Sequence, residues 1–265
     1  MINFKSKSYE IGKKIGRKLF DSYKKLPLAI GLENKNWTDD VCRGLVVGDE
    51  NDQHYLNGVQ LGLENIINVA LSGVQTGLIN TGRSVNGVQL GLSNDGHSMK
   101  GVQVGAVNNE TNKVYGMQIG ILNACSDSWS GKVSGVQVGF GNETNDLRGY
   151  QTGVLNVCRK DGKGVQTGLF NLSDESISGI QIGGFNDAGL IRGLQIGVVN
   201  RAEYLRGVQL GVICSTGCYG DSHSPARYLQ LGLLTLRNDP ELPWFKRISP
   251  LVGWKKACKK SVGNK

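Results

Sequence analysis

The sequence has few of the residues from which active sites are built. Among 265 residues there are three histidines, and only 7% of the residues are aromatic. His54, His97 and His223 are far apart in the sequence, and neither a nucleophile motif nor a phosphate-binding loop is present. An acid–base or covalent active site would have to be assembled from scattered groups. We therefore expect a protein that is not an enzyme and that needs no cofactor.

The cysteines show no disulfide framework, although there are six of them: Cys42, Cys125, Cys158, Cys214, Cys218 and Cys258. Cys125 and Cys158 occupy the same phase of a repeat but lie two repeats apart, which separates them by about 10 Å in a stacked β structure. Cys214, Cys218 and His223 are weak candidates for zinc ligands, because the spacing is loose and no fourth ligand is evident.

Long apolar runs are absent as well. No stretch of about 20 apolar residues occurs, and the first ten residues, MINFKSKSYE, lack the apolar segment of a secretory signal. The sequence therefore predicts neither a transmembrane helix nor export. We expect a cytoplasmic protein, possibly peripheral to a membrane.

What the chain does have is one eight-residue motif that occurs fourteen times, in its clearest form GVQLGLSN from Gly87 to Asn94. The step between copies is mostly 14 or 15 residues, which indicates a repeat architecture with regular surfaces rather than a single pocket. The copies begin at Pro27, Gly44, Gly58, Gly73, Gly87, Gly101, Gly116, Gly135, Gly149, Gly164, Gly179, Gly193, Gly207 and Tyr228.

Five kinds of position recur, and we name them after Gly87–Asn94. Gly87 marks the first glycine, Gly91 the second glycine, and Val88, Leu90 and Leu92 the three aliphatic positions. The second glycine is present in all fourteen copies, so we expect that nothing larger fits there. The Gln position holds Gln60, Gln75, Gln89, Gln103, Gln118, Gln137, Gln151, Gln166, Gln181, Gln195, Gln209 and Gln230. The Asn position holds Asn34, Asn51, Asn65, Asn80, Asn94, Asn108, Asn123, Asn142, Asn156, Asn171, Asn186 and Asn200.

Alternation of apolar with small or polar residues is typical of a half-buried strand. A strand in every repeat fits two architectures, a parallel β-solenoid of about fourteen coils or an antiparallel β-barrel. We favour the solenoid, because stacked coils place each amide above its copy, where Gln and Asn side chains can form hydrogen-bonded ladders. The ladders are interpreted as structural; the alternative is a ladder presented to a flat repetitive partner.

A further apolar residue precedes most motifs by two places, as Leu56 and Leu71 do. This residue is an odd number of positions from each aliphatic position, so in a regular strand its side chain would point to the opposite face. We therefore expect a bend or bulge at the start of each motif. Three steps are lengthened, after Asn34, at residues 126–132 and at residues 215–227, all between the Asn position and the next motif. These insertions predict loops on one edge of the stack, and the last two are possible sites for a protein partner.

The basic charge is concentrated at the two ends. Residues 1–25 contain eight Lys or Arg against Glu10 and Asp21, and residues 244–265 contain seven with no acid. Ile11, Ile15, Leu19 and Tyr23 form an apolar stripe on a predicted basic amphipathic helix. The predicted domains are this helical cap (1–26), the solenoid (27–236), and an aromatic and proline-rich cap with a basic tail (237–265).

We expect the ends to contact an anionic partner, a membrane surface rather than nucleic acid, because lipid can receive an apolar stripe and a phosphate backbone cannot. The contacts would be Lys13, Lys14, Arg17, Lys18, Lys24, Lys25, Lys255, Lys256, Lys259 and Lys260. The helix also has a purely structural interpretation, as a cover for the open end of the solenoid.

The motif Gly-Val-Gln-aliphatic-Gly-aliphatic-x-Asn resembles the short repeats of bacterial proteins described as leptospiral-type surface repeats. The resemblance covers residues 44–232 and implies a repeat fold with a surface location. It implies no activity and no binding residue.

Overall fold

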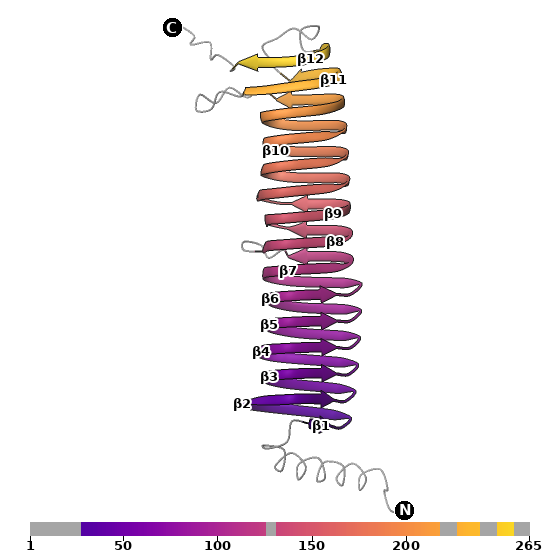
Figure 1. Ribbon diagram of the computed structural model, residues 1–265, viewed down its shortest axis with the longest axis vertical. Coiled ribbons are helices and arrows are strands. Elements are labelled where there is room, and N and C mark those ends of the chain that lie inside the picture. Colours follow the sequence, from indigo (N-terminus) through magenta and orange to yellow (C-terminus); the bar gives the residue numbers. More distant parts are fainter. Residues whose placement is uncertain (1–27, 126–130, 218–226, 239–247, 257–265) are drawn as a thin grey trace, which may run out of the picture. The chain divides into compact units, whose positions relative to one another are not determined.

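A computed structural model describes residues 28–125, 131–217, 227–238 and 248–256 (Figure 1). These residues form strands joined by short bends, and none of them is helical. Accordingly, no helix in this described part could cross a bilayer. The predicted helix of residues 1–26 lies outside the described residues, as do most residues of the predicted C-terminal cap.

The strands follow one another along the chain with little between them. They are β1 (Leu28–Ile30), β2 (Glu33–Val47), β3 (Glu50–Leu61), β4 (Glu64–Thr76), β5 (Ile79–Leu90), β6 (Ser93–Val104), β7 (Val107–Cys125), β8 (Lys132–Thr144), β9 (Asp146–Cys158), β10 (Asp161–Gly217), β11 (Arg227–Asn238) and β12 (Ile248–Lys256).

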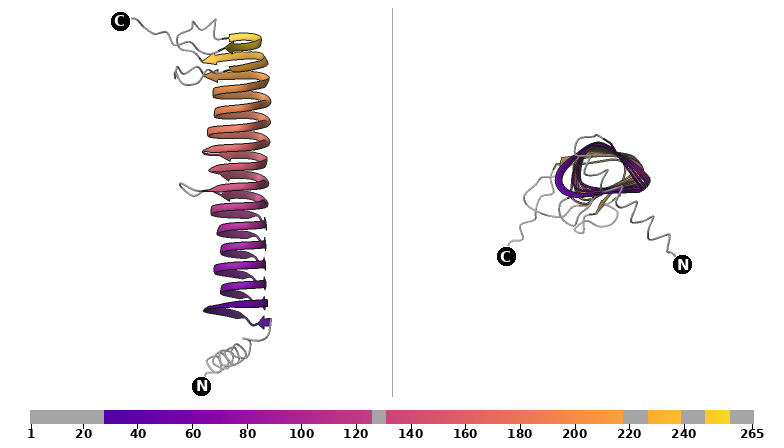
Figure 2. Two further views of the ribbon diagram at one scale, coloured as in Figure 1. Left: turned by 60° about the vertical axis from the view of Figure 1, so that its left-hand side comes forward. Right: turned by 90° about the horizontal axis from the view of Figure 1, so that it is seen from below.

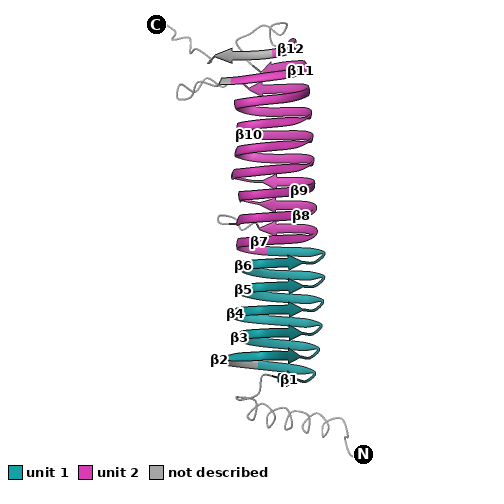
Figure 3. Cartoon of the chain, viewed as in Figure 1, with its two compact units in different colours: residues 1–109 teal, residues 110–265 magenta. Residues whose placement is uncertain are grey.

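The chain divides into two compact units, unit 1 up to Asn109 and unit 2 from Glu110 (Figure 3). Within each unit the chain winds in coils that stack on one another as a parallel β-solenoid (Figure 2). The antiparallel barrel is therefore excluded. Equivalent motif residues pair across neighbouring coils: Gly73 pairs with Gly58 in unit 1, and Gln151 pairs with Gln137 in unit 2.

The register shows where the insertions leave the stack. Pairing between β2 and β3 shifts between Asn36 and Val41, which accommodates the first long step. In unit 2, Cys125 pairs with Thr144 while Lys132 pairs with Lys113, so the additional residues fall between Cys125 and Lys132. Ser215–Gly217 still pair with residues of β11, so the third insertion begins after Gly217. All three insertions fall between the Asn position and the next motif, as predicted, but residues 215–217 belong to the stack and not to the third insertion.

Each motif begins with an irregular backbone. The first glycines from Gly44 to Gly207 have φ between 105° and 155°, a region that L side chains rarely adopt. A Cβ on Gly87 would also lie 1.8 Å from the carbonyl oxygen of Gly73 in the preceding coil. The expected irregularity is present, but the reason given for it is wrong. Leu71 and Gln75 are four residues apart and both are buried, so their side chains point to the same side of the strand, into the interior. The strand therefore does not have to turn over between the preceding apolar residue and the motif.

The parallel order ends at the C-terminal side of unit 2, where β12 pairs antiparallel with β11. The register joins Leu231 to Val252 and Gly232 to Leu251, and Thr235 Oγ1 donates a hydrogen bond to the carbonyl oxygen of Ser249 at 2.7 Å. The backbone of β12 thus occupies the edge of β11. The aromatic side chains of the predicted cap, Trp244, Phe245 and Trp254, are outside the described set.

Candidate interaction surface

Four columns of side chains face the interior of the coils. Two are the Gln and Asn positions, whose members in the described coils are almost all fully buried. A third is aliphatic and precedes the first glycine by two residues, as with Leu147 and Ile177. The fourth follows the Asn position by two residues and holds mixed side chains such as Cys158 and Ala188. Half of the interior is therefore lined by primary amides.

The Asn column is a continuous hydrogen-bonded ladder within each unit. Asn80 Nδ2 donates to Asn94 Oδ1 at 2.9 Å and to the carbonyl oxygen of Leu90 at 2.9 Å. In unit 2, Asn171 Nδ2 donates in the same way to Asn186 Oδ1 at 2.7 Å and to the carbonyl oxygen of Ile182 at 3.0 Å. Both amide hydrogens are satisfied, so burial of these polar groups carries little penalty.

The Gln column forms a second ladder in which the donors point the other way. Gln89 Nε2 donates to Gln75 Oε1 at 2.7 Å, and Gln166 Nε2 donates to Gln151 Oε1 at 2.8 Å, in each case to the preceding coil. The Asn donors point to the following coil. The amide dipoles of the two ladders therefore oppose each other along the axis of each unit, which lowers the net dipole of the interior.

The second glycine makes room for the Asn ladder. A Cβ on Gly183 would lie 2.2 Å from the carbonyl oxygen of Gly168 and 2.6 Å from Asn171 Nδ2. The same collisions arise at Gly91, with Asn80 Nδ2 at 2.6 Å and the Gly77 carbonyl oxygen at 2.7 Å. This explains why no copy of the motif has a side chain at that position.

Both ladders have ends inside the described coils. Gln60 Nε2 is buried and has no hydrogen-bond partner, because the preceding coil has Val46 at the Gln position. At the other end, Cys214 takes the Asn position. Asn200 Nδ2 approaches its sulfur at 3.8 Å, and Sγ donates to the carbonyl oxygen of Leu231 at 3.7 Å. The thiol thus reproduces weakly the pair of contacts that an Asn makes.

The aliphatic positions face outward. In unit 1, Leu63 is 55% exposed and Leu92 is 61% exposed. In unit 2, Phe140 is 61% exposed, and Leu169 and Val198 lie in the same column with more than half of their surface exposed. We call these three columns the aliphatic face of each unit. Each unit therefore exposes a regular apolar surface.

The predicted ladders are therefore present but are not a binding surface. The amides of Gln151 and Asn156 are fully buried, so a flat partner cannot touch them. The alternative of a ladder presented to a repetitive partner is wrong for the described coils. The aliphatic face, by contrast, is exposed.

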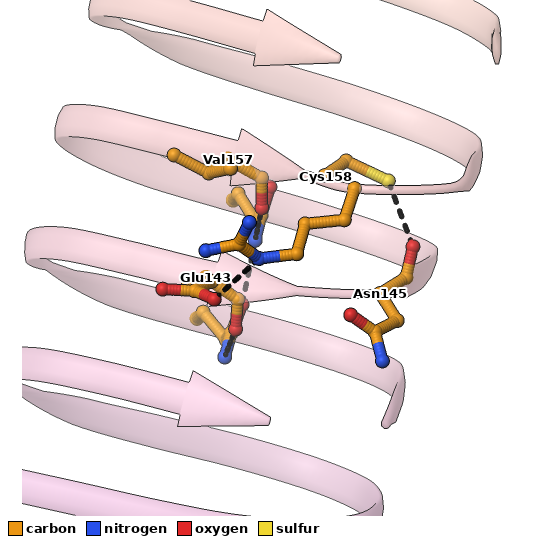
Figure 4. A network of polar contacts seen from close by, with 7 residues as sticks. Glu143, Asn145, Val157 and Cys158 are labelled. Atoms are coloured by element: carbon orange, nitrogen blue, oxygen red, sulfur yellow. Dashed lines mark hydrogen bonds and ion pairs between the residues drawn. The ribbon is translucent and has the colours of Figure 1, made fainter. Parts of the chain in front are cut away.

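The described cysteines are free thiols in the interior or near it. One coil separates Cys125 from Cys158, because Thr144 pairs with both, as the spacing predicted. Cys158 Sγ donates to the carbonyl oxygen of Asn145 at 3.4 Å (Figure 4). Burial raises the pKa of both Cys125 and Cys158 to about 12, so these thiols stay protonated and unreactive at neutral pH.

Of the three weak zinc candidates, the structure describes one. Cys214 is buried within the Asn column, while Cys218 and His223 lie outside the described residues. The described residues contain no group of three or more His, Cys, Asp or Glu side chains that could hold a metal ion. His54 and His97 each follow the Asn position by three residues but lie three coils apart, about 14 Å in a parallel stack.

One cavity of about 270 Å³ is found in unit 2, next to the column that follows the Asn position. Its walls include Ser173 and Ala188, together with the carboxylates of Asp174, Asp187 and Glu203. Arg201 forms an ion pair with Asp187 at 3.4 Å, and burial raises the pKa of Asp187. The small side chains of Ser173 and Ala188 leave this space.

The predicted anionic-partner contacts cannot be placed. Lys13, Lys14, Arg17, Lys18, Lys24, Lys25, Lys259 and Lys260 lie outside the described residues, and for Lys255 and Lys256 only the backbone in β12 is described. The same holds for most of the predicted partner loops at residues 126–132 and 215–227, of which residues 126–130 and 218–226 lie outside the described residues. Sequence reasoning missed the aliphatic face, because it did not assign the aliphatic side of the alternation to the exterior.

No protein-family model, curated protein or solved structure matches this chain.

Proposed function

We propose that this protein is a non-enzymatic interaction scaffold that binds an anionic membrane surface. The observation that carries the proposal is the aliphatic face, whose side chains are exposed although amides fill the interior. Exposed apolar surface is costly in water, and a regular strip of it is typical of contact with another apolar phase or molecule.

The charge of the chain supports an anionic partner. The formal net charge is +8, and the basic residues are concentrated in the two terminal segments. Attraction of such segments to anionic lipid weakens as salt rises, because the interaction is screened. Nucleic acid shares the negative charge but offers no apolar phase to the aliphatic face or to the stripe of Ile11, Ile15 and Leu19.

Co-sedimentation with phosphatidylserine-containing vesicles and a gel shift with nucleic acid test this function together. We expect the intact chain to bind the vesicles, less tightly at high salt, and a chain that lacks residues 1–25 to bind them less well. Binding to nucleic acid alone would replace the membrane with a nucleic-acid partner. Binding to neither at low salt would contradict the proposed function.

A further inference from the structure

A column of basic side chains borders the aliphatic face of unit 2. It consists of residues directly before the first glycine, namely Arg148, Lys163, Arg192 and Arg206; Ser178 lies between Lys163 and Arg192, and Ser134 precedes Arg148. Each lies two residues before the first aliphatic position on the same side of the strand, since successive side chains alternate. Arg148 and Lys163 are direct neighbours in the register of β9 and β10. We call these four residues the basic column.

The basic column is not neutralised within the described residues. Arg148, Lys163, Arg192 and Arg206 form no ion pair there, and Asp146 and Asp161 are the only acids two residues before any of them. By contrast, the basic residues that follow the Asn position are paired. Arg159 contacts Glu143 at 2.7 Å (Figure 4), and Arg201 contacts Asp187. Unpaired positive charge is thus gathered beside the apolar surface.

The aliphatic face of unit 2 has no charged residue at any of its aliphatic positions. Its polar members satisfy one another: Tyr150 Oη lies 2.6 Å from Thr167 Oγ1, which donates to Thr152 Oγ1 at 3.0 Å. Tyrosine and long basic side chains are common where an apolar phase meets polar headgroups, because each has an apolar body and a polar tip.

We propose that the aliphatic face and basic column of unit 2 together form a binding surface for anionic phospholipid. The aliphatic side chains would enter the boundary between headgroups and acyl chains, and the basic column would contact the phosphates. This inference rests on the proposed membrane function and assigns it to a surface of the solenoid in addition to the ends of the chain.

Charge complementarity favours lipid over a second copy of this chain. If two copies pack with their aliphatic faces together, the basic column of one copy has two possible neighbours on the other. One is the other basic column, and the second is the column at the third aliphatic position, which contains Phe140, Leu169 and Val198. Neither offers negative charge. An anionic bilayer supplies both an apolar phase and the counter-charge.

The test uses the full chain with two substitutions that remove charge from the basic column, Arg148→Gln and Arg192→Gln. The matched control, Arg159→Gln with Arg201→Gln, has the same net charge but changes the paired arginines elsewhere on unit 2. We expect the first variant to lower the partition coefficient onto phosphatidylserine-containing vesicles roughly 30-fold, and the control to change it less than about twofold.

A second variant replaces the apolar contacts, with Phe140, Leu169 and Val198 each changed to Thr. Threonine occurs naturally at outward positions 152 and 167, so the fold should remain, which circular dichroism and thermal unfolding check. We expect binding to fall more than about tenfold, because less apolar surface is buried.

The outcomes separate this inference from the proposed function. If both surface variants bind vesicles as the intact chain does, and only removal of residues 1–25 abolishes binding, the inference is wrong and the proposed function stands. If the intact chain binds no vesicles, both are wrong. A third outcome is that the intact protein forms a dimer, that the threonine variant is monomeric, and that vesicles do not dissociate the dimer. The aliphatic face of unit 2 would then bind a second copy of the chain, and the inference would be wrong.

Discussion

The amide columns and the aliphatic face lie on the same strands but differ in what they require of their residues. Gln166 is fully buried, while Leu169, three residues later, is 54% exposed. The Gln and Asn positions each keep one amide in twelve of fourteen motifs, whereas the aliphatic positions include Val, Leu, Ile, Met, Phe, Tyr and Thr. Within the motif, identity between repeats marks the two buried amide positions, and variety marks the outward aliphatic positions.

The difference has a physical cause. Coils about 4.8 Å apart bring each amide nitrogen within hydrogen-bonding distance of the next amide oxygen, so a buried amide is paired only if its neighbours are also amides. An apolar side chain in the same place would leave a buried donor or acceptor unpaired, which costs about 1–3 kcal/mol for each group. An outward side chain faces solvent and need only favour a strand.

The largest effect is expected for a methyl group added at the second glycine. Gly183→Ala places Cβ against the carbonyl oxygen of Gly168 and the amide of Asn171, both of which are fixed by the stack. We expect a loss of roughly 3 kcal/mol or more in the free energy of unfolding, measured by urea titration. The control is Gly184→Ala, one residue later on the outward side, where the nearest atom is the flexible Leu169 Cδ1. Equal losses from the two variants would contradict this packing.

A smaller but still large effect is expected when one amide is removed. Asn171→Leu introduces a bulkier apolar side chain and removes the ladder partner of one Asn156 Nδ2 hydrogen and of Asn186 Oδ1, while Asn156 Nδ2 keeps its bond to the carbonyl oxygen of Thr167. The expected loss is about 2–5 kcal/mol by urea titration, because two buried polar groups become unsatisfied. The matched change on the surface, Leu169→Thr, should cost less than about 1 kcal/mol. If the surface change were the more damaging, the assignment of inside and outside would be wrong.

A gain of stability is expected where the Gln ladder is extended. Val46→Gln would extend the Gln ladder by one coil and give Gln60 Nε2 the acceptor that it lacks; the unpaired donor would move to the first coil, beside Ala29, which is only partly buried. We expect the free energy of unfolding to rise by about 1 kcal/mol. Val46→Met, which has a similar volume and no amide, is the control and should bring no such gain.

The repeat period, the parallel stacking, the ladders and the phase of the insertions could all be predicted, because each depends on the spacing of Gly, Gln and Asn alone. The inward side of the strand could not be predicted from alternation, since the usual rule places aliphatic residues inside. Here paired amides occupy the inward positions of the motif, and the aliphatic residues of the interior precede the motif, so that rule fails within the motif. The basic column was also missed, because Arg148 and Lys163 become neighbours of each other only when the coils are stacked.

The most direct test of this inverted packing is the oxidation of methionine by hydrogen peroxide in the folded protein. Met99 lies in the inward aliphatic column with no exposed surface, whereas Met117 is at an outward aliphatic position and is partly exposed. Peptide mapping over time should show Met117 oxidised many times faster than Met99, with equal rates after unfolding in urea. Protection of Met117 together with rapid oxidation of Met99 would show that the aliphatic positions face inward, and would contradict the account.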